Sequence, residues 1–188
     1  WLPVTLSGSP PRLRDVSLFS LGNKKILQVG GSTGSSPASN DWLLDLQAQR
    51  WSVTPGGPSP QIRALACRVG ADVVALGGTP MRFETAQLKW VSQPSPASYT
   101  TPGALAVTLR SDGSALVFGG TPGAELEGRV LRIPVSGPIT EVAAAPPPAL
   151  NGARLGAIDS STTALTGLVP SGGNRKSYTF SRPSNRWS

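Results

Sequence analysis

Short apolar runs, separated by turn-forming residues, recur along the whole chain. Three of these runs end in a pair of glycines, and a fourth and weaker run ends in Gly167-Leu168. The runs lie at 24–31, 72–78, 114–120 and 163–168. Their first glycines are separated by 47, 42 and 48 residues. A repeat period in this range is typical of propellers and solenoids.

Each run is predicted to be the second strand of a hairpin. The apolar stretches that precede the runs lie at 16–19, 65–69, 105–109 and 155–158. The turns between the two strands are Gly22-Asn23, Gly70-Ala71, Asp112-Gly113 and Asp159-Ser160. Gly, Asn and Asp tolerate the positive φ that such tight turns require.

Two further strands are predicted in each repeat. A variable loop leads to a third strand at 42–46, 85–88, 129–133 and 177–180. A fourth strand is predicted at 51–55, 90–94 and 139–142, and Trp187 marks its start in the last repeat. The first two of these strands run into proline, which suits an outer edge strand because a missing N–H does not break the ladder there.

Four short strands in each period predict an all-β fold, a β-propeller of four-stranded antiparallel blades. The repeats span approximately 12–58, 59–98, 99–150 and 151–188 of one propeller domain or fragment. Residues 1–8 resemble the fourth strand at 51–55, so we expect them to be the outer strand of a preceding or closing blade. A closed ring of four blades and part of a larger propeller are both open. We favour the larger propeller, because Trp1 and Trp187 need not be natural boundaries.

The repeats resemble the kelch repeat, in which an apolar strand ends in a Gly doublet and a later strand carries Trp. The matching residues are Gly30-Gly31 with Trp51, Gly77-Gly78 with Trp90, Gly119-Gly120, and Trp187. Ile139 replaces the third Trp, and the Tyr that often precedes the Trp is missing. The resemblance implies a propeller that serves as a protein-interaction platform. Because inner strands crowd around a propeller's channel, we expect the doublets to lie where a Cβ has no room.

Composition removes most enzymatic chemistry. The 188 residues include no His, one Cys and one Met. Imidazole catalysis, His-ligated metals and internal disulfides are therefore excluded for this chain. Cys67 follows apolar residues and is predicted to be a buried small side chain. We predict a non-enzymatic protein with no catalytic, cofactor-binding or metal-binding residues and no transmembrane segment.

Two acidic features have ordinary explanations. Ser111-Asp112-Gly113 is faintly similar to the Asp-box turn of sialidases, but the Thr-Trp or Thr-Phe pair is absent, so we interpret it as a hairpin turn. Glu125 and Glu127 form a close acidic pair in a Gly-flanked stretch, which is typical of a solvated loop.

The net charge of +7 lies near the two ends of the chain. Residues 1–30 carry +3, residues 151–188 carry +4, and the middle is neutral. The basic residues that could form a seam are Arg12, Arg14, Lys24, Lys25, Arg154, Arg182 and Arg186. If the ends meet, this seam would favour an anionic partner, namely nucleic acid, an acidic protein surface or a polyanionic glycan. A solvated rim that keeps the protein soluble is the alternative.

These observations predict an interaction scaffold that binds a protein partner through its loops, as a subunit of a larger assembly. The candidate loops are 32–40, 79–84, 121–128 and 171–176. The candidate anchors within or beside them are Arg82, Arg129, Arg175 and Lys176. The alternatives are a subunit that contacts nucleic acid through the basic seam and the propeller part of a larger extracellular carbohydrate-active or oxidase protein.

Overall fold

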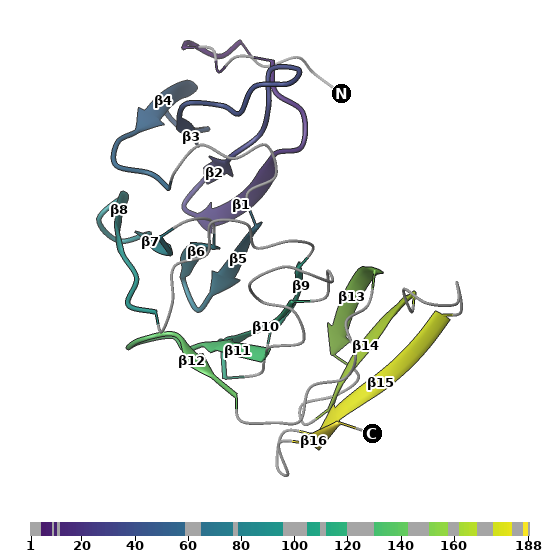
Figure 1. The fold of residues 1–188 in the computed structure, drawn as a ribbon. Helices are drawn as coiled ribbons and strands as arrows, with labels where there is room; N and C mark the ends of the chain where they lie inside the picture. Colours follow the sequence, from purple (N-terminus) through teal and green to yellow (C-terminus); the bar gives the residue numbers. More distant parts are fainter. Residues whose placement is uncertain are drawn as a thin grey trace. The chain divides into compact units, whose positions relative to one another are not determined.

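The chain folds into antiparallel β-sheets in the computed structural model (Figure 1). The structure describes residues 5–8, 10, 12–58, 65–76, 79–95, 105–109, 112–119, 130–142, 151–157, 162–168, 175–181 and 186–187. These residues form sixteen strands and no helix, so the all-β prediction is confirmed for them. The chain divides into two compact units, Trp1–Gln93 and Pro94–Ser188, which we call the first and second units.

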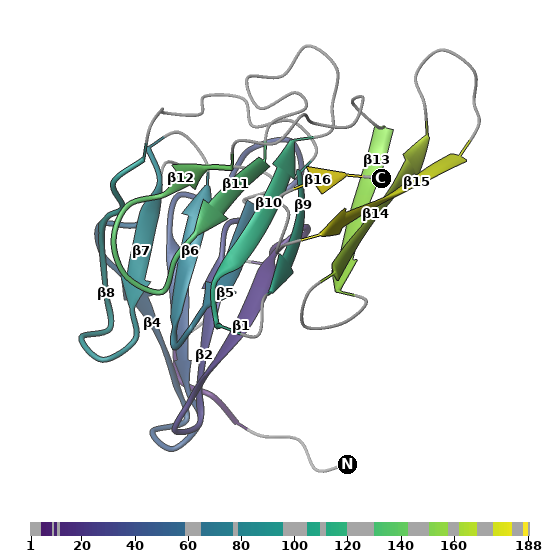
Figure 2. The same ribbon diagram turned by 90° about the horizontal axis from the view of Figure 1, so that it is seen from below.

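The first unit contains two four-stranded sheets, in each of which consecutive strands are neighbours. The first sheet consists of β1 (Ser17–Gly22), β2 (Lys25–Val29), β3 (Asp41–Asp45) and β4 (Arg50–Thr54). The second sheet consists of β5 (Leu65–Val69), β6 (Asp72–Leu76), β7 (Met81–Glu84) and β8 (Lys89–Ser92). Figure 2 shows the strands of this unit from a second direction.

These two sheets share one apolar core. The first sheet contributes Leu21, Leu27, Val29 and Leu43, and the second contributes Val73, Ala75, Phe83 and Trp90. The rings of Phe83 and Trp90 meet edge to face with their centroids 5.3 Å apart. Each large apolar side chain removed from water in this way contributes roughly 1.5–3 kcal/mol. β1 also contacts β5, and the Arg68 guanidinium donates to the Ser20 carbonyl oxygen of β1.

The same turn joins the third and fourth strands of both sheets. Gln49 in the first sheet and Leu88 in the second each adopt a φ of 51°. Trp51 then lies opposite Leu44, and Trp90 lies opposite Phe83. Two sequence repeats therefore produce the same local conformation, including a left-handed residue that is not glycine.

One predicted strand of the first unit was wrong. Residues 85–88, predicted as a strand, form the turn between β7 and β8, and the third strand is β7 at Met81–Glu84. The predicted 79–84 loop is therefore mostly strand. The error arose because Arg82 gives this strand a polar appearance, although its side chain is buried against partners that only the fold brings near.

The second unit contains two further sheets of consecutive strands. One consists of β9 (Leu105–Leu109), β10 (Ala115–Gly119), β11 (Val130–Ile133) and β12 (Thr140–Glu141). The other consists of β13 (Asn151–Ala157), β14 (Thr162–Leu168), β15 (Arg175–Ser181) and β16 (Arg186–Trp187). β9 contacts β13, as β1 contacts β5 in the first unit. The buried apolar residues of β10 and β11 are Ala115, Leu116, Val117, Phe118, Val130, Leu131 and Ile133.

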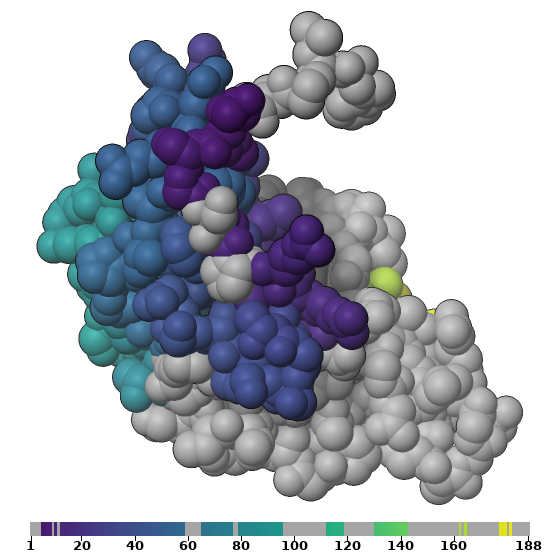
Figure 3. All heavy atoms as spheres, turned by 90° about the horizontal axis from the view of Figure 1, so that it is seen from above, coloured from purple at the N-terminus to yellow at the C-terminus, as the bar shows by residue number. Residues whose placement is uncertain are grey.

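Part of the N-terminal segment lies on the outer edge of the first sheet. Ser7 forms a parallel bridge with Arg50 of β4. The Ser7 amide donates to the Gln49 carbonyl, and the Trp51 amide donates to the Ser7 carbonyl, both at 2.8 Å. Figure 3 shows purple atoms of this N-terminal segment against blue atoms of the first sheet. Residues 1–4 lie outside the described residues, and the expectation that residues 1–8 are the outer strand of a preceding or closing blade stays a prediction.

Candidate interaction surface

The 32–40 loop, between β2 and β3, is a predicted recognition loop that the structure describes in full. Residues 33–37 are exposed, as are Ser39 and Asn40, whereas Ser32 and Ala38 are buried. The exposed part offers mainly hydroxyl and amide groups, which can both donate and accept hydrogen bonds.

Backbone hydrogen bonds hold this exposed loop in one conformation. Arg14 and Ser32 exchange two such bonds at 2.9 Å, which pins the start of the loop to the segment before β1. The Thr33 amide donates to Ser36 at 3.0 Å, and the Ala38 amide donates back to Gly31 at 2.8 Å. In Figure 3 the indigo atoms of the loop lie beside purple atoms of the preceding segment. A surface ordered in this way loses less conformational entropy on binding than a flexible loop.

Gly31 makes the close approach of these two segments possible. Its φ is +111°, a conformation that other L-residues rarely adopt. A Cβ at this position would lie 2.6 Å from Val16 Cγ1 and 3.0 Å from the Arg14 carbonyl oxygen. The expectation that the doublet lies where a Cβ has no room is confirmed at Gly31.

Two exposed cations lie in the segment before β1, whose backbone pairs with the start of the loop at Arg14. Arg12 and Arg14 are exposed, and neither forms an ion pair with another described residue. Lys24 is also exposed, whereas Lys25 is ion-paired with Asp45. Arg154 lies in β13 and Arg186 in β16, both in the second unit, and Arg182 lies outside the described residues. Whether these residues form a single basic seam stays a prediction.

The Asp41 side chain joins the two ends of the loop, and the sequence did not identify it as a candidate residue. Its Oδ1 accepts a hydrogen bond of 2.8 Å from the Gly30 amide, so that the first residue after β2 is joined to the first residue of β3. Only 6% of Asp41 is exposed. Burial raises the pKa of this carboxyl to about 6, although the Gly30 hydrogen bond favours the charged form. A single Asp at the start of a strand carries no sequence signal of this role.

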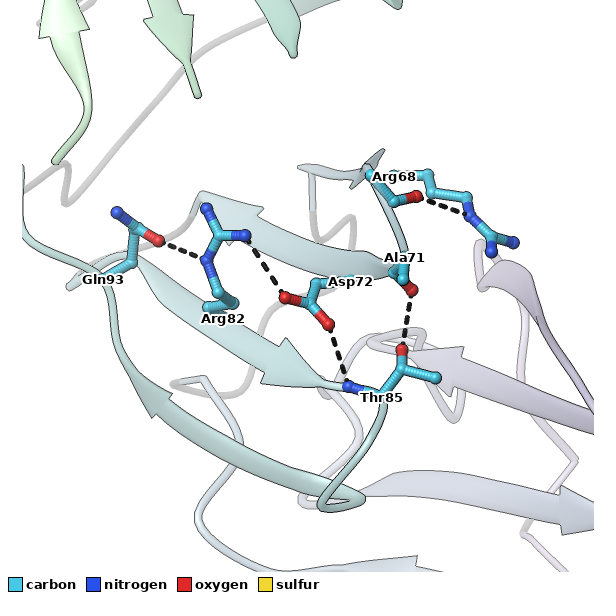
Figure 4. Close-up of polar contacts among 7 residues, drawn as sticks. Arg68, Ala71, Asp72, Arg82, Thr85 and Gln93 are labelled. Carbon is cyan, nitrogen blue, oxygen red and sulfur yellow. Dashed lines mark hydrogen bonds and ion pairs between the residues drawn. The ribbon is translucent and has the colours of Figure 1, made fainter. Parts of the chain in front are cut away.

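Arg82, predicted as an anchor, is bound within the second sheet (Figure 4). Its Nε donates to Gln93 Oε1 at 2.6 Å, and its Nη1 lies 3.4 Å from Asp72 Oδ2. The other Asp72 oxygen accepts from the Thr85 amide at 3.0 Å, and the Thr85 hydroxyl donates to the Ala71 carbonyl at 2.7 Å. The side chain of Arg82 is 9% exposed, so this network joins strands and offers little to a partner.

The remaining predicted anchors lie in the second unit. Arg175 and Lys176 are the first two residues of β15, so the predicted 171–176 loop ends before them. Arg129, the 121–128 loop and residues 171–174 lie outside the described residues, as do Glu125 and Glu127. These parts of the predicted surface stay predictions.

Two other residues considered for chemistry, Cys67 and Asp112, have structural roles. Cys67 is buried, as predicted, and burial raises the pKa of its thiol to about 12, which disfavours the nucleophilic thiolate. Asp112 accepts hydrogen bonds from the amide and hydroxyl of Ser114 and pairs with Arg132, consistent with a hairpin turn.

The described residues contain neither a cluster that could hold a metal ion nor a helix that could span a membrane. Asp, Glu and Cys do not gather there in groups of three that could hold a metal ion. In the same ranges, no helix has the length and apolar character that a membrane span needs.

Comparison with known proteins did not identify a family. No protein-family model matches the chain, and no curated protein matches it.

Proposed function

We propose that this chain is a kelch-like β-propeller, or part of one, that acts as a non-enzymatic scaffold and binds a protein partner through its loops. Four sheets of four consecutive strands support this proposal, because such sheets are the blades of propellers. The contacts of β1 with β5 and of β9 with β13 also support it, since the first strands of successive blades are neighbours around a propeller axis.

The observation that carries the proposed function is the combination of exposure and order in the 32–40 loop. Its tip is in solvent, while hydrogen bonds to Arg14 and Gly31 fix its base. Loops held by a rigid scaffold are the usual place for recognition.

The proposed partner is a protein surface with acidic side chains. Arg12 and Arg14 are exposed, and the backbone of Arg14 is paired with Ser32 at the start of the loop. Arginine can form paired hydrogen bonds with a carboxylate, and it is enriched among residues that dominate binding energy.

Site-specific crosslinking tests this proposal. A photoreactive residue at Ser35 would lie at the loop tip, and the same residue at Gln47 would lie on the exposed turn between β3 and β4. We expect a defined protein crosslink from position 35 and a much weaker one from position 47. Equal labelling from both positions, or no protein crosslink from position 35, would contradict the proposal.

A nucleic-acid partner is the second candidate, favoured by the exposure of Arg12, Arg14 and Lys24. Binding to phosphates releases counterions, so such a complex should weaken steeply as salt rises. A partner interaction that is insensitive to salt would exclude this candidate.

A further inference from the structure

Three buried polar side chains lie at the root of the 32–40 loop, and each has an atom with no hydrogen-bond partner among the described residues. These atoms are Asp41 Oδ2, Thr54 Oγ1 and Trp90 Nε1. Asp41 and Trp90 are each 6% exposed, and Thr54 is 5% exposed. An unpaired polar group at such a depth costs about 1–3 kcal/mol, so three together call for an explanation.

Asp41 is the common neighbour of the other two side chains. Asp41 in β3 and Thr54 in β4 are directly opposite each other in the antiparallel ladder, so their side chains share a face of the first sheet. A Cβ on Gly57 would lie 2.6 Å from Asp41 Oδ2 and 3.3 Å from Trp90 Nε1. The carboxylate of the first sheet and the indole of the second therefore both border Gly57, where any side chain would fill the space between them.

The donor and acceptor set fits a small ligand that both donates and accepts. The carboxylate oxygen accepts, the indole N–H can only donate, and the threonine hydroxyl can do either. A metal ion does not suit this set, because the indole N–H cannot ligate it. A water molecule can accept from Trp90 and donate to Asp41, while it also bonds Thr54. Buried waters typically form about three such bonds.

We propose that Asp41, Thr54 and Trp90 bind one buried water molecule that ties the root of the 32–40 loop to the second sheet. Asp41 is the centre of this arrangement, since its other oxygen already holds the Gly30 amide. The water would extend that clamp from β3 of the first sheet to β8 of the second. This site does not depend on the proposed partner.

NMR of the full chain with labelled tryptophan tests the site without any partner. We expect the Trp90 indole proton to show a dipolar cross-peak with a long-lived water, identified by opposite signs in the laboratory and rotating frames. The peak should persist in Thr54→Val, because Asp41 and Trp90 still hold the water. The exposed Thr33→Val variant, in the loop itself, serves as the matched control and should leave the peak unchanged.

Two results would overturn the proposal. Absence of the cross-peak in the natural sequence would mean that no long-lived water contacts the indole. Its complete loss in Thr54→Val would mean that the signal was relayed from the threonine hydroxyl. Each variant's remaining amide spectrum shows whether it has folded, so a misfolded protein is not mistaken for either result.

Discussion

At the scale of single residues, Asp41 is a buried carboxylate at the start of β3. It closes the loop through Gly30, it borders Gly57, and it lies in the buried region between the first two sheets. The groups found against it, which are the Gly30 amide, Thr54, Gly57 and Trp90, carry no charge. Its negative charge is therefore costly to keep in the folded state.

Asp41→Asn should stabilise the protein at neutral pH. The folded pKa of about 6 lies above the ordinary value of 3.8, so the folded state binds more protons between these values. The contribution of Asp41 to stability is therefore greatest below about pH 4 and is lost as pH rises through 6. Asn keeps an oxygen for Gly30 and has no charge, so we expect a gain of up to about 3 kcal/mol at pH 7.5.

Urea unfolding from pH 4 to pH 8 measures this effect. The difference between the Asn variant and the natural sequence should grow across the window from about pH 4 to pH 6. A difference that is constant with pH would show that the Asp41 carboxyl is not perturbed.

Gly31→Ala should destabilise the first unit and disturb the loop. The new Cβ would meet Val16 at 2.6 Å in a backbone conformation that alanine rarely adopts. We expect a cost of about 3 kcal/mol in denaturant unfolding. Gly34→Ala is the matched control: Gly34 also has a positive φ, but nothing lies within 4 Å of its Cβ position, and about 1 kcal/mol is expected. Equal costs would refute the close approach of the two segments.

At the scale of strands, an ion pair connects the third strand of three of the sheets to the second strand or to the turn before it. The pairs are Lys25–Asp45, Asp72–Arg82 and Asp112–Arg132. In the first pair the cation comes before the anion in the sequence, whereas in the other two pairs the anion comes first. The three connections are therefore similar in place but use different residues. Their burial differs, since the side chains are 9% and 27% exposed in the second pair and 43% and 42% exposed in the third.

This difference in burial predicts that the second and third ion pairs contribute unequally to the free energy of unfolding. Arg82→Met should cost about 2 kcal/mol, because it removes the hydrogen bond to Gln93 and the ion pair with Asp72 in a mostly buried setting. Arg132→Met should cost less than about 1 kcal/mol, because the charged groups of Arg132 and Asp112 are both well solvated. Methionine keeps much of the apolar stem in both variants. Thermal unfolding compares them, and a larger cost at Arg132 would contradict the assignment.

The sequence predicted most strands of the first two sheets because apolar runs and turn residues are local signals. It failed at β7, where Arg82 interrupts the apolar pattern. The spacing of Glu84 from Trp90 equals that of Asp45 from Trp51, and this match could have placed the strand correctly. The burial of Asp41 and the Arg82 network could not be predicted, because Trp90, Gln93 and Asp72 become neighbours only in the folded sheets.

At the scale of the whole molecule, we propose that the chain is a scaffold held in a complex by protein contacts. The loops of a propeller are available for recognition because its strands are used by the ladders and the core. In this chain, the 32–40 loop with Arg12 and Arg14 is the surface that the structure describes best.

The size of the native complex, measured under mild salt with and without nuclease, tests this claim most directly. It should be compared for the natural sequence and for a variant that carries Arg12→Glu and Arg14→Glu. We expect a large species that survives nuclease and that shrinks in the variant, because the reversed charges would repel an acidic partner. A complex that collapses with nuclease, or a protein that travels alone in both forms, would contradict the proposed function.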